Sequence, residues 1–393
     1  MKGSREGYSL LVVAAVLMAA GLADACTAII VGRKASASGR VVIAHNNDGV
    51  GPYTMQYALL PARDHNPGET MLSGPGVAKI PEARHSAACY WAEVKSGTGK
   101  PPPADHFLSE RGVLVISNNG GVMAKWGDET YELPEEGRSS GLRDGGLGHC
   151  FRRAVAERAG TAREAVAIAT NLIETWGYSM PSRLFTIADK DEAWVLEVLR
   201  GRRYVARRCP DDAVVVHPNC LTIGRLRPGD VVSPCFAAKG PDFDFIRSYQ
   251  GPRTWKSDYN RYRWRSTYIT VAGVDPGEPD EYPFSVKPAH PVSADEIKRA
   301  LRSHYEGMPW QVAGKHPVDG PKNVVPVCRR GTVQSMLCMF ADDPSETELH
   351  VAAGRPCETP YVRCRPFAGE LLPGAVTGAA ALKRLEDHWL PGP

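Results

Sequence analysis

The sequence of 393 residues lacks the features that would place it in several common classes of protein. Its formal charge is only +3, with 47 Lys and Arg against 44 Asp and Glu, which argues against nucleic acid or acidic lipid as a partner. None of its ten cysteines forms a CxxC pair or a Cys/His cluster with the spacing of zinc sites, so the sequence predicts no metal site. Because 43% of the residues are apolar, the chain can still bury a substantial core, and small polar substrates stay open.

After the N-terminus, no stretch is apolar enough to cross a membrane. Residues 1–25 instead have the pattern of a secretory signal peptide: Lys2 and Arg5 precede an apolar run at 8–22, and Ala-Asp-Ala at 23–25 forms an A-x-A cleavage site. A short buried helix or a membrane anchor is the alternative. We therefore predict export to the periplasm, the extracellular space or a lysosome-like lumen, with no stable membrane insertion after cleavage. Such compartments are oxidising, so cysteines can pair there.

The hydrophobic pattern predicts strands, then helices, then strands again. The predicted elements are a hairpin of strands at 26–32 and 40–46, a strand at 112–119, one or two helices within 148–177, two or three strands between 183 and 209, a helix at 293–305, and short strands to about 353. Ser293 and Glu296 form the capping box of the later helix. This order fits an α+β or layered αββα domain better than alternating βαβ units. We predict a single domain over 26–393, with a weakly patterned tail from about 370.

Cys26 directly follows the predicted cleavage site. Cleavage there would give this residue both a thiol, with a pKa of about 8.5, and an α-amine, with a pKa of about 7.7–8.0. The amine could then act as the base that activates the thiol, as in N-terminal threonine nucleophiles. Disulfide formation and lipidation are the alternatives, but a lipoprotein site would have Leu near position 23 and no charge at Asp24. Lipidation is therefore disfavoured, whereas a nucleophile and a disulfide cysteine both stay open for Cys26 at this point.

Polar residues follow the second strand of the predicted hairpin. The segment His-Asn-Asn-Asp at 45–48 would return beside Cys26, where Asp48 could hold the α-amine. Asn, Asp and Gly also favour turns whatever their function, and composition alone favours a turn here. The segment Ser-Asn-Asn-Gly-Gly at 117–121 has the same two interpretations.

Several stretches between residues 26 and about 370 occur in an order that resembles a known family. They are CTAIIVGRKASASGRVVIAHNND at 26–48, VISNNGGV at 115–122, ERAGTAREAV at 157–166, IADKDEAWVLEV at 187–198, YVARRCPDD at 204–212, LRSHYEGMPW at 301–310 and CETPYVRCRPFAG at 357–369. Together they resemble the dipeptidase-A family of cysteine-type N-terminal nucleophile (Ntn) hydrolases, which are related to the secernins. The combination is specific, although any single stretch would be weak.

The resemblance implies a four-layer αββα sandwich that hydrolyses short peptides, chiefly dipeptides, without a metal or an organic cofactor. It makes Cys26 the nucleophile and Asp48 the residue that orients the amine. Asn219 resembles the oxyanion-side asparagine of the wider cysteine Ntn group. The remaining site residues that the resemblance implies are Asn118 and one arginine, for which Arg261 and Arg263 both fit.

Two positions depart from the family pattern. Asn118 is followed by Asn119 where the family has Glu, and His45 stands where the family has Arg or Lys. We assign His45 to substrate binding. Since histidine titrates near 6.5, its support for a thiolate would weaken as the pH rises through that value.

Two other functions stay open. An amidase of the same fold could cleave a non-peptide amide, such as an acylated amine or a penicillin-like compound. A non-catalytic exported binding protein could use the same scaffold. The oligomeric state also stays open.

Among the remaining residues, Trp194 is predicted to pack in the core, and His217 and His304 are predicted to be structural.

Overall fold

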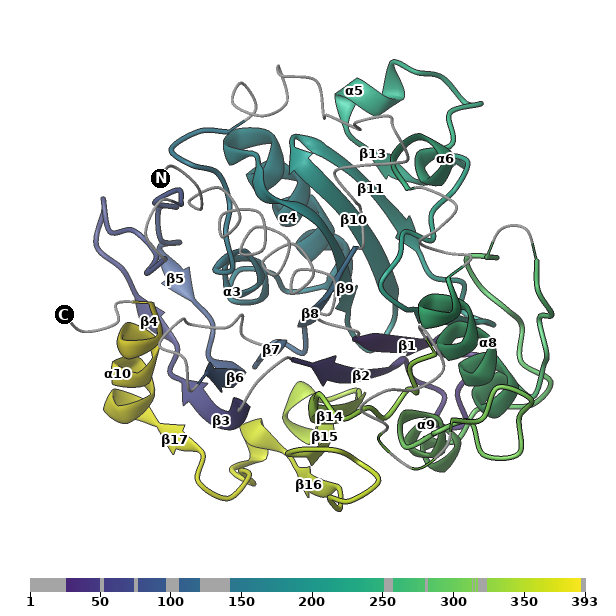
Figure 1. The fold of residues 1–393 in the computed structure, drawn as a ribbon. Helices are drawn as coiled ribbons and strands as arrows, with labels where there is room; N and C mark the ends of the chain where they lie inside the picture. Colours follow the sequence, from purple (N-terminus) through teal and green to yellow (C-terminus); the bar gives the residue numbers. More distant parts are fainter. Residues whose placement is uncertain are drawn as a thin grey trace, which may run out of the picture.

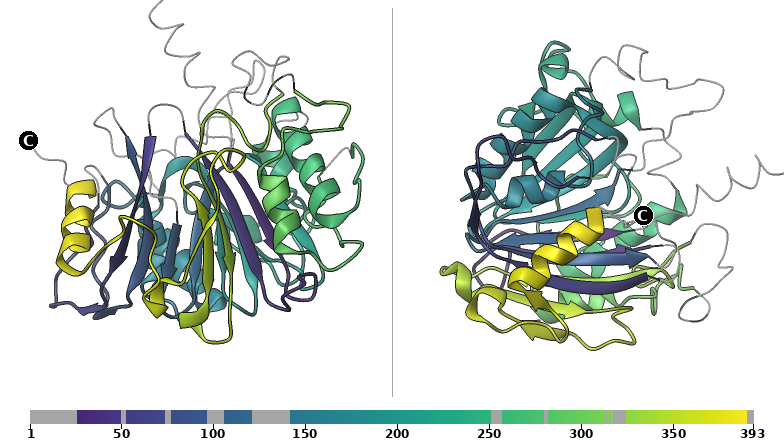
Figure 2. Two further views of the ribbon diagram at one scale, coloured as in Figure 1. Left: turned by 90° about the horizontal axis from the view of Figure 1, so that it is seen from below. Right: turned by 90° about the vertical axis from the view of Figure 1, so that its left-hand side faces the viewer.

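The protein is represented by a computed structural model, which describes residues 26–49, 53–73, 77–96, 106–120, 142–250, 257–279, 282–312, 314, 316 and 324–389. The predicted signal peptide at 1–25 lies outside the described residues. Two large β-sheets face each other, and helices cover their outer sides (Figures 1 and 2). Within the described part of the chain, no helix is long and apolar enough to cross a membrane.

The sheet that carries Cys26 has six antiparallel strands. Its strands, in spatial order, are β12 (Val214–His217), β1 (Thr27–Val31), β2 (Val42–Asp48), β14 (Thr332–Met339), β15 (Glu348–Ala352) and β16 (Val362–Cys364). The predicted hairpin is the β1–β2 pair, in which Thr27 lies opposite Asn46 and Ala28 lies opposite His45. The hairpin prediction is therefore confirmed.

The second sheet has nine strands and forms the other inner layer. Its strands, in spatial order, are β13 (Val231–Val232), β11 (Arg203–Arg208), β10 (Ala193–Gly201), β9 (Tyr178–Ala188), β8 (Leu114–Asn119), β7 (His106–Ser109), β6 (Cys89–Ser96), β3 (Tyr53–Leu60) and β17 (Val376–Thr377). A separate pair consists of β4 (Arg63–Asp64) and β5 (His85–Ser86).

Helices pack against the outer face of each sheet (Figure 1). The nine-stranded sheet is covered by α3 (Phe151–Ala156) and α4 (Ala162–Trp176), and the six-stranded sheet by α8 (Asp258–Ala272) and α9 (Ala294–Leu301). The other described helices are α5 (Pro234–Ala237), α6 (Phe245–Tyr249), α10 (Gly378–Trp389) and the 3₁₀ turns η1 (Pro344–Glu346) and η2 (Pro366–Ala368). The helix–sheet–sheet–helix order confirms the predicted four-layer α+β fold.

Alternating side chains on β1 contribute to two hydrophobic cores, one on each face of the sheet. Ala28 and Ile30 join the core between the two sheets, whereas Ile29 and Val31 pack under α8 and α9. This alternation follows from the two-residue period of a strand. Because all four side chains are buried, β1 reads as a continuous apolar run, as expected for a strand covered on both faces.

The helix predictions are confirmed in most respects. Residues 148–177 form α3 and α4, and Thr161 caps α4 by accepting a hydrogen bond from the Glu164 backbone N–H at 3.1 Å. The predicted capping box of α9 is present, but the helix ends at Leu301 and not at residue 305. Beyond the helix, Tyr305 adopts a positive φ of 70°, so the chain is not helical there.

One sequence-based interpretation is wrong. The segment Asn46–Asp48 is not a turn, since it continues β2 and pairs with β14. The weakly patterned tail from about 370 forms β17 and α10 beside β3. Strands β3, β6 and β7 were not predicted. All ten cysteines are free thiols, although the oxidising compartment predicted for the chain would permit disulfides.

Candidate active site

Cys26 lies immediately before β1 and is almost fully buried, with 4% of its surface exposed. Its Sγ atom is 3.7 Å from Oδ1 of Asn47 and 3.9 Å from the backbone oxygen of Asp48. The hairpin therefore brings the 45–48 segment beside Cys26, as the sequence predicted. Both residues belong to the end of β2, so a regular strand and not a loop positions them.

A buried arginine from α8 lies on the other side of Cys26. The Arg263 guanidinium donates to the Cys26 backbone oxygen at 2.7 Å and to Thr27 Oγ1 at 3.1 Å. It also donates to Oδ1 of Asn219 at 3.0 Å and to Oδ1 of Asn260 at 2.8 Å. A guanidinium remains charged and can hold several oxygens in a fixed plane. Arg263 therefore places a permanent positive charge at the start of β1.

Arg261, the alternative arginine, is directed elsewhere. Its guanidinium pairs with Asp258 at 2.7 Å and with Glu278 at 3.3 Å, on the partly exposed side of α8. Of the two candidates, Arg263 is the one beside Cys26. Helical periodicity could have identified it, because Arg263 shares the buried face of α8 with Trp264 and Thr267.

The two asparagines from the resemblance join the ends of the two sheets. Asn219 follows β12, and its side-chain amide donates to the backbone oxygen of Asn119 at 3.2 Å. Asn118 is on β8, and its amide donates to the backbone oxygen of His217 at 3.1 Å. Asn219 is linked to Cys26 by one intervening residue, Arg263. Asn118 instead contacts the backbone of β12. Asn118 therefore supports the frame in which Asn219 is held.

Asp48 combines a satisfied oxygen with an unsatisfied one. Its Oδ1 accepts a hydrogen bond from Thr332 Oγ1 at 2.6 Å, whereas Oδ2 is buried and has no hydrogen-bond partner among the described residues. Burial raises the pKa of Asp48 to about 6, and the charges of Arg329 and Arg263 oppose that rise. A buried carboxylate oxygen without a donor is a ready acceptor for an ammonium group.

His45 lies deeper in the same sheet and is fully buried. It is paired with Ala28 of β1 and with Met336 of β14, and a charge on it would lower the pKa of Asp48. Strand alternation puts His45 on the same face of β2 as Asn47. It is thus an internal neighbour of the site, and its assignment to substrate binding stays a prediction.

Sequence reasoning missed Arg329 and Thr332. Neither had a local signal, because they reach Asp48 only through the long-range pairing of β14 with β2.

Other singled-out residues have structural roles. Trp194 is buried in the core under α4, as predicted. His217 is buried beside Thr222, with a distance of 3.0 Å between its Nδ1 and Thr222 Oγ1, and burial lowers its pKa to about 3. Because its pKa is so far below neutral, His217 is too weak a base to take the proton of Cys26.

The fold brings together four Cys and His residues whose sequence spacing predicted no metal site. His304, His316, Cys328 and Cys357 bring their donor atoms within 4.8 Å of one another. Their wide spacing in the sequence matches no local zinc motif, so only the fold reveals the group. The cluster lies outside the residues that surround Cys26.

Comparisons with known proteins support the resemblance. The profile of a family described as peptidase family C69 matches residues 149–240. A dipeptidase from Bifidobacterium longum is 26% identical over 332 residues, which cover 74% of this chain and 61% of that protein. A probable dipeptidase from Salmonella dublin is 27% identical over 345 residues, which cover 80% of this chain and 75% of that protein. The resemblance to the dipeptidase-A family is thereby confirmed.

A solved structure was also found to be similar. The penicillin V acylase from Agrobacterium tumefaciens aligns over 86% of each chain, with 10% sequence identity and a TM-score of 0.43. A likeness of this size supports no conclusion about function.

Proposed function

We propose that this chain, which is similar to peptidase family C69 and to curated dipeptidases, is a cysteine-type hydrolase that cleaves short peptides, chiefly dipeptides. The observation that carries the proposal is the position of Cys26. Its backbone oxygen accepts from the Arg263 guanidinium, and its thiol lies against the end of β2 that bears Asp48.

Removal of residues 1–25 would prepare this site for catalysis. The neutral α-amine of Cys26 would become free, and after it has taken the thiol proton it could donate to Oδ2 of Asp48, the oxygen without a described partner. Arg263, which holds the backbone oxygen of Cys26, would fix the position of this residue. Export and activation would then be a single event, because the cleavage that releases the chain also creates the base.

The reaction would then follow the course of an acyl transfer. The amine accepts the thiol proton, and the Cys26 sulfur attacks the carbonyl carbon of the peptide bond. The amide of Asn219 has two N–H groups, of which one binds Asn119, so the other can stabilise the oxyanion together with a backbone N–H. The protonated α-amine passes its proton to the leaving amine, and water hydrolyses the thioester.

The substrate class is tested with the secreted protein. Mass spectrometry determines its N-terminus, and a panel of dipeptides is assayed with the wild type and with Cys26→Ala. We expect a chain that begins at Cys26, and a loss of kcat/KM of at least about 10³-fold in the variant. Cys235→Ser is the matched control, because Cys235 is the exposed cysteine and should leave the activity unchanged.

Other outcomes would contradict specific parts of the proposal. A mature chain that starts elsewhere, or one whose Cys26 carries a lipid, would exclude the α-amine as the base. Correct processing with turnover of non-peptide amides alone would favour the amidase. A correctly processed chain that binds peptides but does not cleave them would favour a binding protein.

A further inference from the structure

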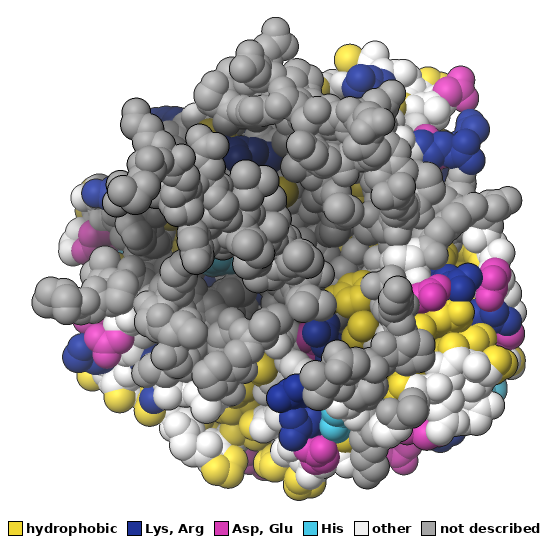
Figure 3. Space-filling model, in the orientation of Figure 1, with side chains coloured by type: hydrophobic (Ala, Val, Ile, Leu, Met, Phe, Trp, Pro, Cys, Tyr) yellow, Lys and Arg dark blue, Asp and Glu magenta, His cyan; other side chains and the backbone are white. Residues whose placement is uncertain are grey.

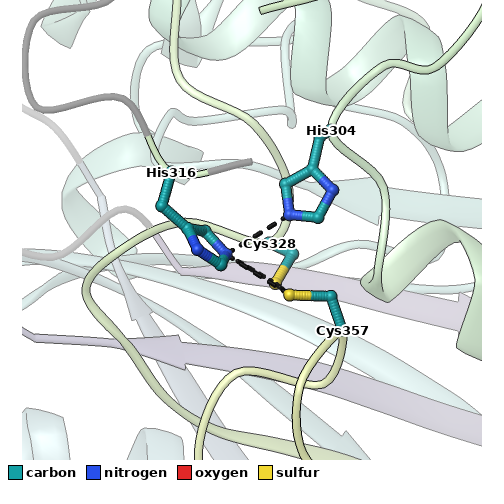
Figure 4. A group of neighbouring side chains, drawn as sticks. All are labelled: His304, His316, Cys328 and Cys357. Atoms are coloured by element: carbon teal, nitrogen blue, oxygen red, sulfur yellow. Dashed lines mark hydrogen bonds between the residues drawn. The ribbon is translucent and has the colours of Figure 1, made fainter. Parts of the chain in front are cut away.

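Two histidines and two cysteines meet in a second cluster, which we call the His₂Cys₂ cluster: His304, His316, Cys328 and Cys357 (Figure 4). His304 follows α9, Cys328 precedes β14, and Cys357 lies between β15 and β16. Figure 4 shows the four side chains pointing toward one another from separate segments. The proposed mechanism uses none of them.

Four of the six distances between the ligand atoms match those around one tetrahedral ion, and all six are within 4.8 Å. The Nε2 atoms of His304 and His316 are 3.3 Å apart, and the two sulfurs are 3.4 Å apart. Nε2 of His316 is 3.7 Å from the Cys328 sulfur and 3.3 Å from the Cys357 sulfur. Zn–S bonds of about 2.3 Å and Zn–N bonds of about 2.0–2.1 Å in a tetrahedron separate the ligand atoms by roughly 3.3–3.8 Å.

Carboxylates orient both imidazole rings. Nδ1 of His304 is 2.8 Å from Oε1 of Glu306, and Nδ1 of His316 is 3.3 Å from Oε1 of Glu358. A carboxylate accepts a hydrogen bond from Nδ1–H and thereby leaves the Nε2 lone pair for a metal. This is the usual arrangement around metal-bound histidine. These contacts are independent of the ligand distances. They direct both lone pairs toward the centre of the cluster, where a cation would satisfy them.

We propose that the His₂Cys₂ cluster binds one structural Zn²⁺ ion. Two cysteines and two histidines in a tetrahedron are a ligand set typical of zinc. Binding would release the two thiol protons, and the two thiolates would neutralise the charge of the ion. Four protein ligands leave no position for water or substrate, so the site would stabilise the fold and not take part in catalysis.

The cluster is connected to the candidate active site through β2. The side-chain amide of Asn46 donates to the backbone oxygens of Leu301 and Val327, both at 2.9 Å. These carbonyls lie close in sequence to His304 and Cys328. Arg329, next to Cys328, donates to Tyr259 at 3.2 Å and lowers the pKa of Asp48. A bound ion would therefore hold the segment that positions Arg329 near Asp48.

A disulfide between Cys328 and Cys357 is the competing state. Their sulfurs are 3.4 Å apart, and an exported chain would pass through an oxidising compartment. A disulfide would remove both thiolate ligands. The two states differ in metal content and in the number of free thiols, so one preparation can distinguish them.

The test measures zinc in the full-length secreted protein purified without a chelator. We expect about one zinc ion per chain, a loss of that ion in Cys357→Ser, and full retention in Cys235→Ser and in Cys26→Ala. The Cys26→Ala control shows that the active-site thiol does not hold the ion. Since Cys357→Ser could misfold, His316→Ala serves as a second ligand variant, and circular dichroism checks the fold of each protein.

Reconstitution provides a readout that does not depend on the purified metal content. After chelation, we expect a lower melting temperature in the wild type, restored by one equivalent of Zn²⁺, whereas His316→Ala should not respond. Co²⁺ in place of zinc should give a thiolate-to-cobalt charge-transfer band. A folded, fully reduced wild type that binds neither ion would overturn the proposal, and so would a Cys328–Cys357 disulfide in the native protein.

Discussion

At the scale of single residues, Asp48 illustrates how a candidate catalytic group can weaken the fold. Burial raises its pKa to about 6, so the folded state disfavours the charged form. The stability that Asp48 contributes is therefore complete below its unfolded pKa of about 3.9, and it is lost as the pH rises through about 6. At neutral pH the protein holds a carboxylate that is useful for orienting an amine but costly to keep buried.

We therefore predict opposite effects of Asp48→Asn on stability and on activity. Above pH 6 the free energy of unfolding should increase by up to about 3 kcal/mol, since each pKa unit corresponds to about 1.4 kcal/mol. Below pH 4 the two proteins should be equally stable. The value of kcat/KM should fall, because Asn cannot hold an ammonium group by charge. Urea titrations at pH 4 and pH 8, with dipeptide assays at pH 8, provide the measurement.

The exposed Asp242→Asn is the matched control for that comparison. It should change the stability by no more than about 0.5 kcal/mol at either pH. If Asp48→Asn were less stable than the wild type at pH 8, the attraction of Arg329 and Arg263 would exceed the cost of burial.

Sequence could predict the residues of the site that depend on local patterns. Cys26 directly follows the predicted cleavage site, and the hairpin that returns Asp48 to it is a contact between neighbouring strands. Arg329 could not be predicted, since its approach to Asp48 depends on a strand pairing across most of the chain. The His₂Cys₂ cluster was missed for the same reason, as its members come from separate segments.

At the scale of elements, polar composition gave a misleading prediction for β2. Asn46, Asn47 and Asp48 favour turns, yet they continue the strand because β14 supplies backbone partners. The side-chain amide of Asn46 donates to the backbone oxygens of Val327 and Leu301, and Oδ1 of Asp48 accepts from Thr332. The polar end of β2 is thus built by its tertiary neighbours.

The C-terminal helix α10 had a usable signal that its Gly- and Ala-rich context concealed. Ala381, Leu385 and His388 recur at helical spacing, and all three are buried. His388 Nδ1 lies 2.9 Å from Oε1 of Glu93 on β6, and the ring of His388 packs edge-on against Trp91. Figure 1 shows α10 at the end of the molecule beside β3. The helix therefore covers one end of the nine-stranded sheet.

We predict that Leu385→Ala lowers the free energy of unfolding by about 2–4 kcal/mol, because it leaves a cavity under α10. Lys383→Ala, at an exposed position of the same helix, should change it by less than about 0.5 kcal/mol. Chemical denaturation of the two variants tests this. Equal stabilities would mean that α10 unfolds separately from the sheet, and hydrogen exchange of the helix would then show weak protection in the wild type as well.

At the scale of the whole molecule, the candidate site depends on contacts between the two sheets. Ile30 and Met336 from one sheet share a core with Ile116 and Val195 from the other. On the described part of the face in Figure 3, side chains of both charge signs lie close together along the rim. The layered fold could be predicted from element order and resemblance. The polar links between the layers could not, because each joins residues far apart in the sequence.

Glu197 forms one of these links and supports the segment that carries Asn219. On β10 it is fully buried, and its carboxylate accepts hydrogen bonds from the backbone N–H groups of Thr222 at 2.6 Å and Ile223 at 3.2 Å. Burial raises the pKa of Glu197 to about 7, although those hydrogen bonds act to lower it. At pH 5 the carboxyl is therefore neutral, and Gln is its close match in shape and charge.

We predict that Glu197→Ala lowers the free energy of unfolding by about 3 kcal/mol at pH 5, because two buried backbone N–H groups lose their acceptor. Glu197→Gln should stay within about 1 kcal/mol of the wild type at pH 5 and become the more stable protein above pH 7. The sign follows from the raised pKa, since the stability contributed by the wild-type carboxyl is lost as the pH rises through about 7. The exposed Glu386→Ala should match the wild type. If Glu197→Ala kept full kcat/KM while losing stability, the position of Asn219 would not depend on this link, and the connection between the two sheets would be structural alone.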